Sequence, residues 1–232
     1  MINDLFDYSG LKIFQDNKKF KFALDSILLA EFVELNKKES KIVDFCTGNA
    51  PVPLILSTKT KNQIWGIEIQ KRIYELGKKS VSYNKLENQI TLINDNVLHS
   101  KKYFSLATID IVTCNPPYFK KHSGIINGDY EKAIARHEIT ISLEDIIKSA
   151  ASILKNKGLL YMVHRPERLE ELSNTLNRYN FKIKKMVMVH SSLKDKALAV
   201  LIKAVKNGSS GLIVEKPLII GNMQTYQNVF RR

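Results

Sequence analysis

The sequence predicts an α/β protein built on a doubly wound, mostly parallel sheet. From residue 41 onward, short apolar runs alternate with amphipathic stretches of helical period. The apolar runs that we interpret as strands are 41–46, 63–69, 90–93, 109–113, 159–163, 181–189 and 198–205. Strands that alternate with helices form parallel sheets with helices on both faces. Ligands of such sheets bind at the carboxyl ends of the strands, so we expect a functional site at that edge.

Helix signals lie between the predicted strands. The helices that we expect are 51–57, 71–86, 143–154 and 166–179. Pro51 and Pro166 suit the first position of a helix, and Ser142 with Asp145 resembles a capping box. In the stretch 71–86, the side chains expected on the inner face are Ile73, Leu76, Val81 and Tyr83.

The chain divides into a short preface, one main domain and a short extension. In the preface, residues 1–36, Lys12–Gln15 and Phe20–Phe22 are expected to form a hairpin. Asp25 or Ser26 should then cap a helix that runs to about Leu35. Residues 37–207 form the main domain, and residues 208–232 should add a short strand or two and a basic tail packed on the same domain.

The composition points to a polyanionic partner. The chain carries 36 lysine and arginine residues against 23 aspartate and glutamate residues, a net charge of +13. It has no apolar stretch of about 18 residues or more and no signal peptide at its amino end. The two cysteines, Cys46 and Cys114, lack metal-ligand companions at short spacing. We therefore expect a cytoplasmic protein without a metal, whose cysteines are small core residues.

The sharpest chemical signal is Asn115-Pro116-Pro117-Tyr118, directly after the predicted strand 109–113. Neither proline has an N–H group, so the loop is stiff and extended. The Asn115 side chain and the Pro116 carbonyl could accept both hydrogens of an –NH2 group, and Tyr118 offers a flat face for stacking. This set fits an exocyclic amine on a planar ring.

Three further signals follow neighbouring strands. The run from Asp44 to Asn49 closes one strand and opens a helix, where Gly48 allows a tight turn close to a ligand. Glu68 ends the next strand and is placed to hold ribose hydroxyls. Asp95 ends the third, where it could reach an adenine amine. Their joint placement with Asn115 favours a nucleoside-type cofactor beside the acceptor pair.

These motifs, in this order, resemble those of class I methyltransferases. The closer resemblance is to the bacterial tRNA1(Val) adenine-N(6)-methyltransferase family, and it covers about residues 10 to 220. The family hallmarks that we find are Gln15, Lys21-Phe-Ala-Leu-Asp25-Ser-Ile-Leu-Leu-Ala30, Lys41-Ile-Val-Asp-Phe-Cys-Thr-Gly-Asn49, Val112-Thr-Cys-Asn-Pro-Pro-Tyr-Phe-Lys120 and Ala135-Arg-His-Glu138. One departure is Ala50-Pro51, where the family usually has a second glycine.

The resemblance implies a Rossmann-like class I methyltransferase fold, with a seven-stranded sheet whose last strand is antiparallel. It implies S-adenosylmethionine as cofactor, with Glu68 on its ribose and Asp95 on its adenine. The implied catalytic residues are Asn115, Pro116, Pro117 and Tyr118. The implied cofactor-binding residues are Lys21, Asp25, Asp44, Cys46, Thr47, Gly48, Asn49, Glu68, Ile69, Asp95, Asn96 and Asn115.

The RNA contacts are expected in basic segments. The stretch from Lys120 to Glu138 follows the catalytic loop, and we interpret it as a substrate-contacting flap that is mobile without RNA. The candidate nucleic-acid-binding residues are Lys18, Lys19, Lys120, Lys121, Arg136, His137 and Arg165. Further basic candidates are Lys101, Lys102, His164, Lys182, Lys184, Lys185, Arg231 and Arg232.

The implied reaction is methylation of the N(6) amine of an adenosine in tRNA, next to the anticodon of tRNA1(Val), by a monomer. Three alternatives stay open. A DNA adenine methyltransferase shares the catalytic loop but usually carries a target-recognition domain. A protein glutamine methyltransferase acting on release factors also uses Asn-Pro-Pro-Tyr but carries a helical amino-terminal domain. A non-enzymatic RNA-binding module would have no reason to keep an acceptor pair beside a cofactor pocket.

Overall fold

The computed structural model describes residues 2–5, 10–15, 24–35, 40–117 and 141–221. The large sheet contains β3 (Ile42–Phe45), β4 (Ile64–Ile67), β5 (Ile90–Ile93), β6 (Ile109–Cys114), β7 (Leu154–His164), β8 (Phe181–His190), β9 (Ala199–Lys206), β10 (Ile213–Val214) and β11 (Leu218–Ile219). The small sheet pairs β1 (Ile2–Asp4) with β2 (Lys12–Phe14). The helices are α1 (Leu24–Phe32), α2 (Pro51–Lys59), α3 (Lys71–Tyr83), α5 (Leu143–Ile153) and α6 (Leu169–Arg178), with 3₁₀ helices η1 (Val97–Lys102) and η2 (Pro166–Arg168).

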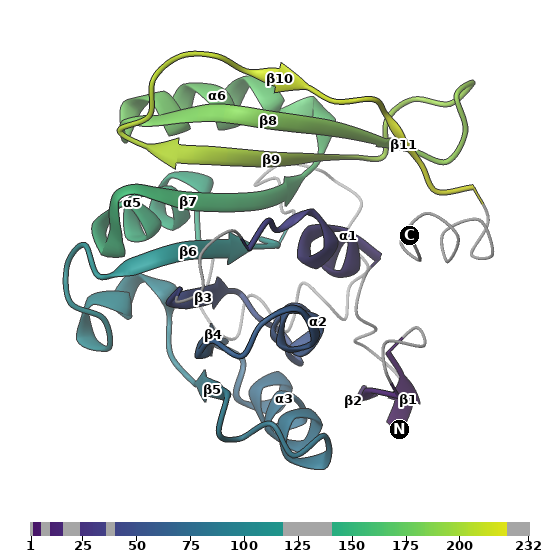
Figure 1. The fold of residues 1–232 in the computed structure, drawn as a ribbon, viewed down its shortest axis with the longest axis vertical. Coiled ribbons are helices and arrows are strands. Elements are labelled where there is room, and N and C mark those ends of the chain that lie inside the picture. Colours follow the sequence, from purple (N-terminus) through teal and green to yellow (C-terminus); the bar gives the residue numbers. More distant parts are fainter. Residues whose placement is uncertain (1, 6–9, 16–23, 36–39, 118–140, 222–232) are drawn as a thin grey trace.

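The large sheet runs in the order β10-β8-β9-β7-β6-β3-β4-β5, and β11 also pairs with β8 (Figure 1). The central strands pair in parallel, and β9 is antiparallel to both β7 and β8. All seven predicted strands are present, and the antiparallel last one is confirmed. Among the described residues, β10 and β11 extend the sheet to nine strands, so the count of seven was too low, but these are the short strand or two expected after residue 207. Each is two residues long.

Helices cover both faces of the sheet, which makes three layers. Successive strand residues point to opposite faces, so Ile42 joins the core beneath α1 and α2, whereas Val43 joins the core beneath α5 and α6. The same alternation separates Ile111 from Val112 in β6. Strands buried on both faces explain why the sequence shows continuous apolar runs. None of the helices in the described ranges is long and apolar enough to cross a membrane.

The predicted helix starts are largely confirmed. Pro51 occupies the start of α2, and Ser142 caps α5 through a reciprocal capping box with Asp145. Two expectations were wrong. Asp25 and Ser26 lie inside α1 rather than before it. Tyr83, the last residue of α3, is 57% exposed because its ring packs edge-on against Phe14 of β2 rather than against the sheet.

The amino-terminal strands pack against α3 and reach the edge of the sheet where the site lies. The Phe14 N–H donates to Ser80 Oγ (2.9 Å), and the Phe14 carbonyl accepts from Asn49 Nδ2 (2.8 Å). The expected hairpin partner, Phe20–Phe22, lies outside the described residues. The pairing that the structure shows for β2 is with β1. Thus a strand from the start of the chain braces the loop that follows β3.

Candidate active site

The carboxyl ends of the central strands meet at one edge of the sheet, as predicted. Phe45 of β3 is in register with Ile67 of β4 and with Cys114 of β6. Glu68 and Asn115 therefore directly follow residues that flank Phe45 on its two sides. The predicted acceptor loop, the loop after β3 and the acid after β4 come from distant parts of the sequence and are brought together here.

The loop after β3 is tightly curled. Cys46, Gly48 and Ala50 all have left-handed backbone conformations, with φ of 56°, 60° and 72°. The helix α3 packs closely against it, since a Cβ atom on Gly77 would lie 3.4 Å from the Gly48 carbonyl oxygen. Ala50 is fully buried at the start of α2. The positive φ of Ala50 explains why a glycine is favourable at this position.

Replacing Ala50 with glycine should relieve this strain. We expect the free energy of unfolding to rise by roughly 0.5–1 kcal/mol. The left-handed backbone destabilises the folded alanine protein, and this effect exceeds the stability that alanine contributes by making the unfolded chain less flexible. Urea denaturation of Ala50→Gly measures the change. Ala150→Gly is the matched control, because Ala150 is buried inside α5 and this variant should be less stable than the parent by about 1 kcal/mol. A loss of stability in both variants would contradict the assignment of strain to Ala50.

Glu68 ties the loop after β3 to the end of β4. One carboxylate oxygen accepts from the Gly48 N–H and the other from the Gln70 N–H, each at 2.9 Å. Only 5% of the residue is exposed. Burial raises the pKa of Glu68, although these backbone donors act in the opposite direction. The carboxylate is therefore a fixed, buried acceptor at the position where ribose binding was expected.

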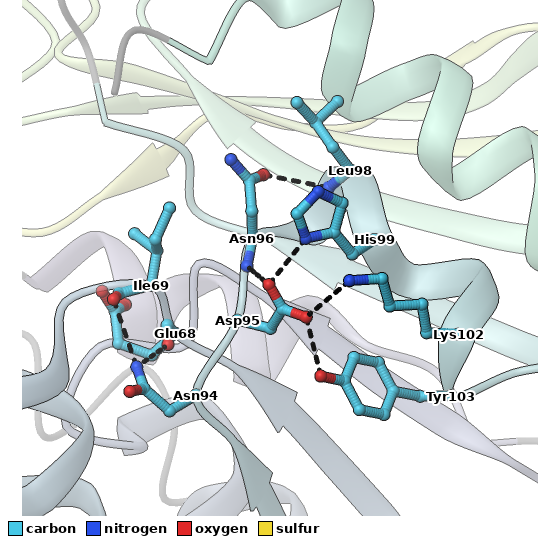
Figure 2. A network of polar contacts seen from close by, with 9 residues as sticks. All are labelled: Glu68, Ile69, Asn94, Asp95, Asn96, Leu98, His99, Lys102 and Tyr103. Carbon is cyan, nitrogen blue, oxygen red and sulfur yellow. Dashed lines mark hydrogen bonds and ion pairs between the residues drawn. The ribbon is translucent and has the colours of Figure 1, made fainter. Parts of the chain in front are cut away.

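Asp95 lies at the centre of a polar network after β5 (Figure 2). Its carboxylate accepts from Tyr103 Oη (2.7 Å) and the Asn96 N–H (2.6 Å), and it contacts His99 Nδ1 (2.7 Å). Lys102 Nζ lies 4.0 Å away. Partial burial raises the pKa of Asp95, but the hydrogen bonds outweigh it and hold the pKa at about 2. Asp95 is thus ionised and held in one orientation.

Asp44 differs sharply from Asp95. It is 1% exposed at the centre of the sheet, and its Oδ1 accepts from Thr113 Oγ1 at 2.6 Å. Burial raises its pKa to about 7, the Thr113 hydrogen bond opposes this, and the nearby Glu68 carboxylate adds to it. Asp44 therefore changes its charge near neutral pH while Asp95 does not.

Asn115 is oriented by α1. Its Nδ2 donates to Ser26 Oγ at 3.0 Å, across 89 residues of sequence. Ser26 is buried, so the amide is held from the protein side. Pro116 is buried and Pro117 is exposed. The Asn115 amide nitrogen is therefore engaged by Ser26 and held in one orientation.

Asn49 offers an unused polar atom in the loop after β3. Asn49 Oδ1 is buried and finds no hydrogen-bond partner among the described residues, whereas the Thr47 hydroxyl acts on the nearby Asp44 carboxyl. Ile69 is half-buried, and its carbonyl accepts from Asn94 Nδ2 (3.1 Å). Asn96 caps η1 through the Leu98 N–H.

Cys114 is a buried core residue as predicted, whereas Cys46 is half-buried and in contact with it.

Two neighbouring basic residues that were predicted to contact nucleic acid lie in different environments. Arg165 is exposed, and its guanidinium donates to the Leu198 carbonyl (3.0 Å). His164 is 1% exposed, and burial, with help from the nearby Arg168 charge, lowers its pKa to about 4. His164 is therefore a neutral core residue and not a phosphate contact. Predicted site residues outside the described ranges are Lys18, Lys19, Lys21, Tyr118, Lys120, Lys121, Arg136 and His137.

Sequence reasoning missed the residues that hold the site in place. Ser26 and Thr113 act on partners far away in the chain, so nothing local identifies them. His99 and Tyr103 follow Asp95 by one and two helical turns, a spacing that could have been noticed. Within the described residues, no group of three or more His, Cys, Asp or Glu side chains could hold a metal ion.

Comparison with known proteins agrees with this architecture. The family model "Methyltransferase small domain" matches residues 21–191. A tRNA1(Val) (adenine(37)-N6)-methyltransferase from Porphyromonas gingivalis is 25% identical over 178 residues, covering 74% of this chain and 69% of that protein. The enzyme of the same name from Flavobacterium psychrophilum is 21% identical over 217 residues and covers 90% of each chain. These similarities confirm the resemblance predicted from the motifs.

Solved structures share the fold. A predicted O-methyltransferase from Agrobacterium tumefaciens superposes with a TM-score of 0.69 at 19% identity, covering 90% of this chain and 97% of that one. TrmK of M. capricolum, in complex with S-adenosyl-homocysteine, superposes with a TM-score of 0.57 at 17% identity, covering 83% and 72%. The strand order and the edge that gathers Glu68, Asp95 and Asn115 define a methyltransferase of Rossmann-like fold. The chain belongs to the methyltransferase small domain family, whose model matches most of its length.

Proposed function

We propose that this protein transfers a methyl group from S-adenosylmethionine to the N(6) amine of an adenosine in tRNA. The observation that carries the proposal is the Asn115 amide, held by Ser26 beside the edge where Glu68 and Asp95 end their strands. An amine acceptor next to two ordered carboxylates is what transfer between a nucleoside cofactor and a planar –NH2 group requires. The names of the relatives support position 37 of tRNA1(Val), next to the anticodon.

The residues present fit the cofactor. Glu68 is a buried carboxylate for ribose hydroxyls, and Asp95 is an ionised carboxylate for an adenine amine. The unpartnered Asn49 Oδ1 lies in the curled loop expected to line the methionine portion. Asp25, in the first turn of α1, would close the methionine end of the cofactor site. When bound, S-adenosylmethionine supplies an electrophilic methyl group.

The protein's own contribution is positioning. A target adenosine leaves its stack and enters beside Asn115. The Asn115 carbonyl oxygen and the Pro116 carbonyl accept the two N–H groups of the amine, which draws its lone pair out of conjugation with the ring and toward the methyl group. The additional proton becomes acidic once the new N–C bond forms, so it can leave to solvent. The rate enhancement therefore comes from orientation and fixed dipoles.

Methyl transfer from labelled S-adenosylmethionine tests the proposal on three substrates side by side: valine tRNA transcript, duplex DNA and a release factor. We expect label in tRNA alone, recovered as N(6)-methyladenosine. Label in the release factor would assign the protein to the glutamine methyltransferases instead. Label in DNA would assign it to the DNA adenine methyltransferases. No transfer and no cofactor binding would leave an RNA-binding module.

A further inference from the structure

The loop between β8 and β9, residues 191–198, has an unusual surface. Its tip residue Leu193 is 77% exposed, the most exposed large apolar side chain among the described residues. Lys194 and Lys196 follow the tip residue and are both exposed. Neither lysine forms an ion pair with any residue in the described part of the chain. The β8–β9 loop therefore presents an apolar tip beside two available cations.

The β8–β9 loop leaves the sheet at the same edge as Asn115. His164, the last residue of β7, pairs with Val200 at the start of β9, and Met162 of β7 pairs with Cys114 of β6. At this edge β6 and β9 are therefore two inter-strand spacings apart, about 10 Å across the sheet. In Figure 1 the loop protrudes on the right, the side to which the arrowheads of β6 and β7 point.

Hydrogen bonds within the β8–β9 loop fix its shape. Asp195 Oδ2 accepts from Ser191 Oγ (2.7 Å) and Ser192 Oγ (2.8 Å), so the one acidic side chain of the loop is engaged internally. The Asp195 carbonyl contacts His190 Nδ1 at 2.9 Å. The Leu198 N–H donates to the Val189 carbonyl at 2.7 Å. The exposed side chains thus stand on an ordered loop, which lowers the entropy lost on binding.

Arg165 connects the β8–β9 loop to the site. It directly follows β7, and its guanidinium donates to the Leu198 carbonyl at 3.0 Å. This contact attaches the base of the loop to the end of the strand next to β6. The exposed guanidinium also adds a third cation on this side of the loop.

We propose that the β8–β9 loop binds the RNA backbone beside the target adenosine, an inference that rests on the proposed function. Lys194 and Lys196 contact phosphates, and Leu193 packs against the face of a neighbouring unstacked nucleotide. Single-stranded RNA loops are recognised by this combination of cations and apolar or flat surfaces. Phosphate contacts set position and register, so the loop orients the RNA while Asn115 receives the base.

Steady-state methylation of valine tRNA tests the proposal. Lys194→Ala/Lys196→Ala should raise the KM for tRNA at least about tenfold and reduce the slope of log affinity against log salt by about 1.4, the value for two phosphate contacts on a single strand. The kcat and the affinity for S-adenosylmethionine should stay within about twofold. Lys194→Arg/Lys196→Arg should restore the KM. Leu193→Ala should raise the KM without changing the salt slope, because it removes no charge.

The matched control is Lys41→Ala/Lys61→Ala. These exposed lysines precede β3 and β4, at the opposite edge of the sheet, and their loss removes the same charge. If both double variants raise the KM equally, the effect is general electrostatics and the proposal is overturned. A changed oligomeric state in Leu193→Ala with an unchanged KM would make the loop a protein contact, which also overturns it. Failure of the parent protein to methylate tRNA would overturn the proposed function itself.

Discussion

Replacing Asn115 with alanine is expected to lower kcat for methyl transfer to tRNA by at least about 100-fold, the effect of removing one well-placed polar group from a transition state. The variant loses the side-chain acceptor for the substrate amine. Glu68 and Asp95, which we propose to hold the cofactor, keep their backbone and side-chain partners. Affinity for S-adenosylmethionine, measured by calorimetry, should therefore change by no more than about threefold.

Ser26→Ala tests, in the same methyl-transfer assay, how much the orientation of the Asn115 amide contributes to kcat. This variant keeps the Asn115 carbonyl oxygen but removes the hydroxyl that holds the amide nitrogen. We expect kcat to fall by about 5- to 20-fold, between the parent and Asn115→Ala, with an unchanged affinity for the cofactor. If Asn115→Ala loses cofactor binding as severely as turnover, Asn115 is a cofactor ligand and not the amine acceptor. Normal turnover in Asn115→Ala would overturn the mechanism.

Replacing Asp44 with asparagine is expected to stabilise the protein increasingly as the pH rises from 5 to 8. The pKa of Asp44 is about 7 in the folded protein and has its ordinary value of 3.8 in the unfolded chain. Between these values the folded state holds a proton that the unfolded state has lost, so the free energy of unfolding falls as pH rises through this window. The full difference corresponds to roughly 4 kcal/mol. Asparagine does not titrate, and its carbonyl oxygen can still accept from Thr113.

Urea denaturation of both proteins at pH 5 and pH 8 measures the effect. The stability of Asp44→Asn relative to the parent should increase between the two pH values, while other titrating groups cancel in the comparison. Glu144→Gln is the matched control. Hydrogen bonds from Arg178 and Tyr179 lower the pKa of Glu144 from its ordinary value of 4.5, so it is largely ionised in both folded and unfolded states above about pH 5, and its stability difference should be nearly flat across the range. A flat difference for Asp44→Asn would mean that Asp44 is ionised in the folded protein at pH 5.

Much of the fold follows from local patterns in the sequence. The seven main strands, the proline at the start of α2 and the capping box of α5 were all predictable, because each depends on residues close together in the chain. Residues at the ends of parallel strands must share one edge, so the gathering of Glu68 and Asn115 was predictable too. The wrong predictions concern side chains whose environment depends on elements far away in the sequence. Neither the exposure of Tyr83 nor the burial of His164 is visible without the packing of neighbouring elements.

The sequence by itself determined which polar groups follow the central strands at the carboxyl edge of the sheet: an amide after β6 and carboxylates after β4 and β5. Only the tertiary structure decided how those groups behave. Asp44 and Asp95 both stand near the ends of strands, yet one has a pKa of about 7 and the other about 2. The first is sealed inside the sheet, where burial disfavours its charge, and the second is surrounded by donors that favour it. Burial and partners arise from the packed chain, and for that reason the alternating pattern of the sequence could not reveal them.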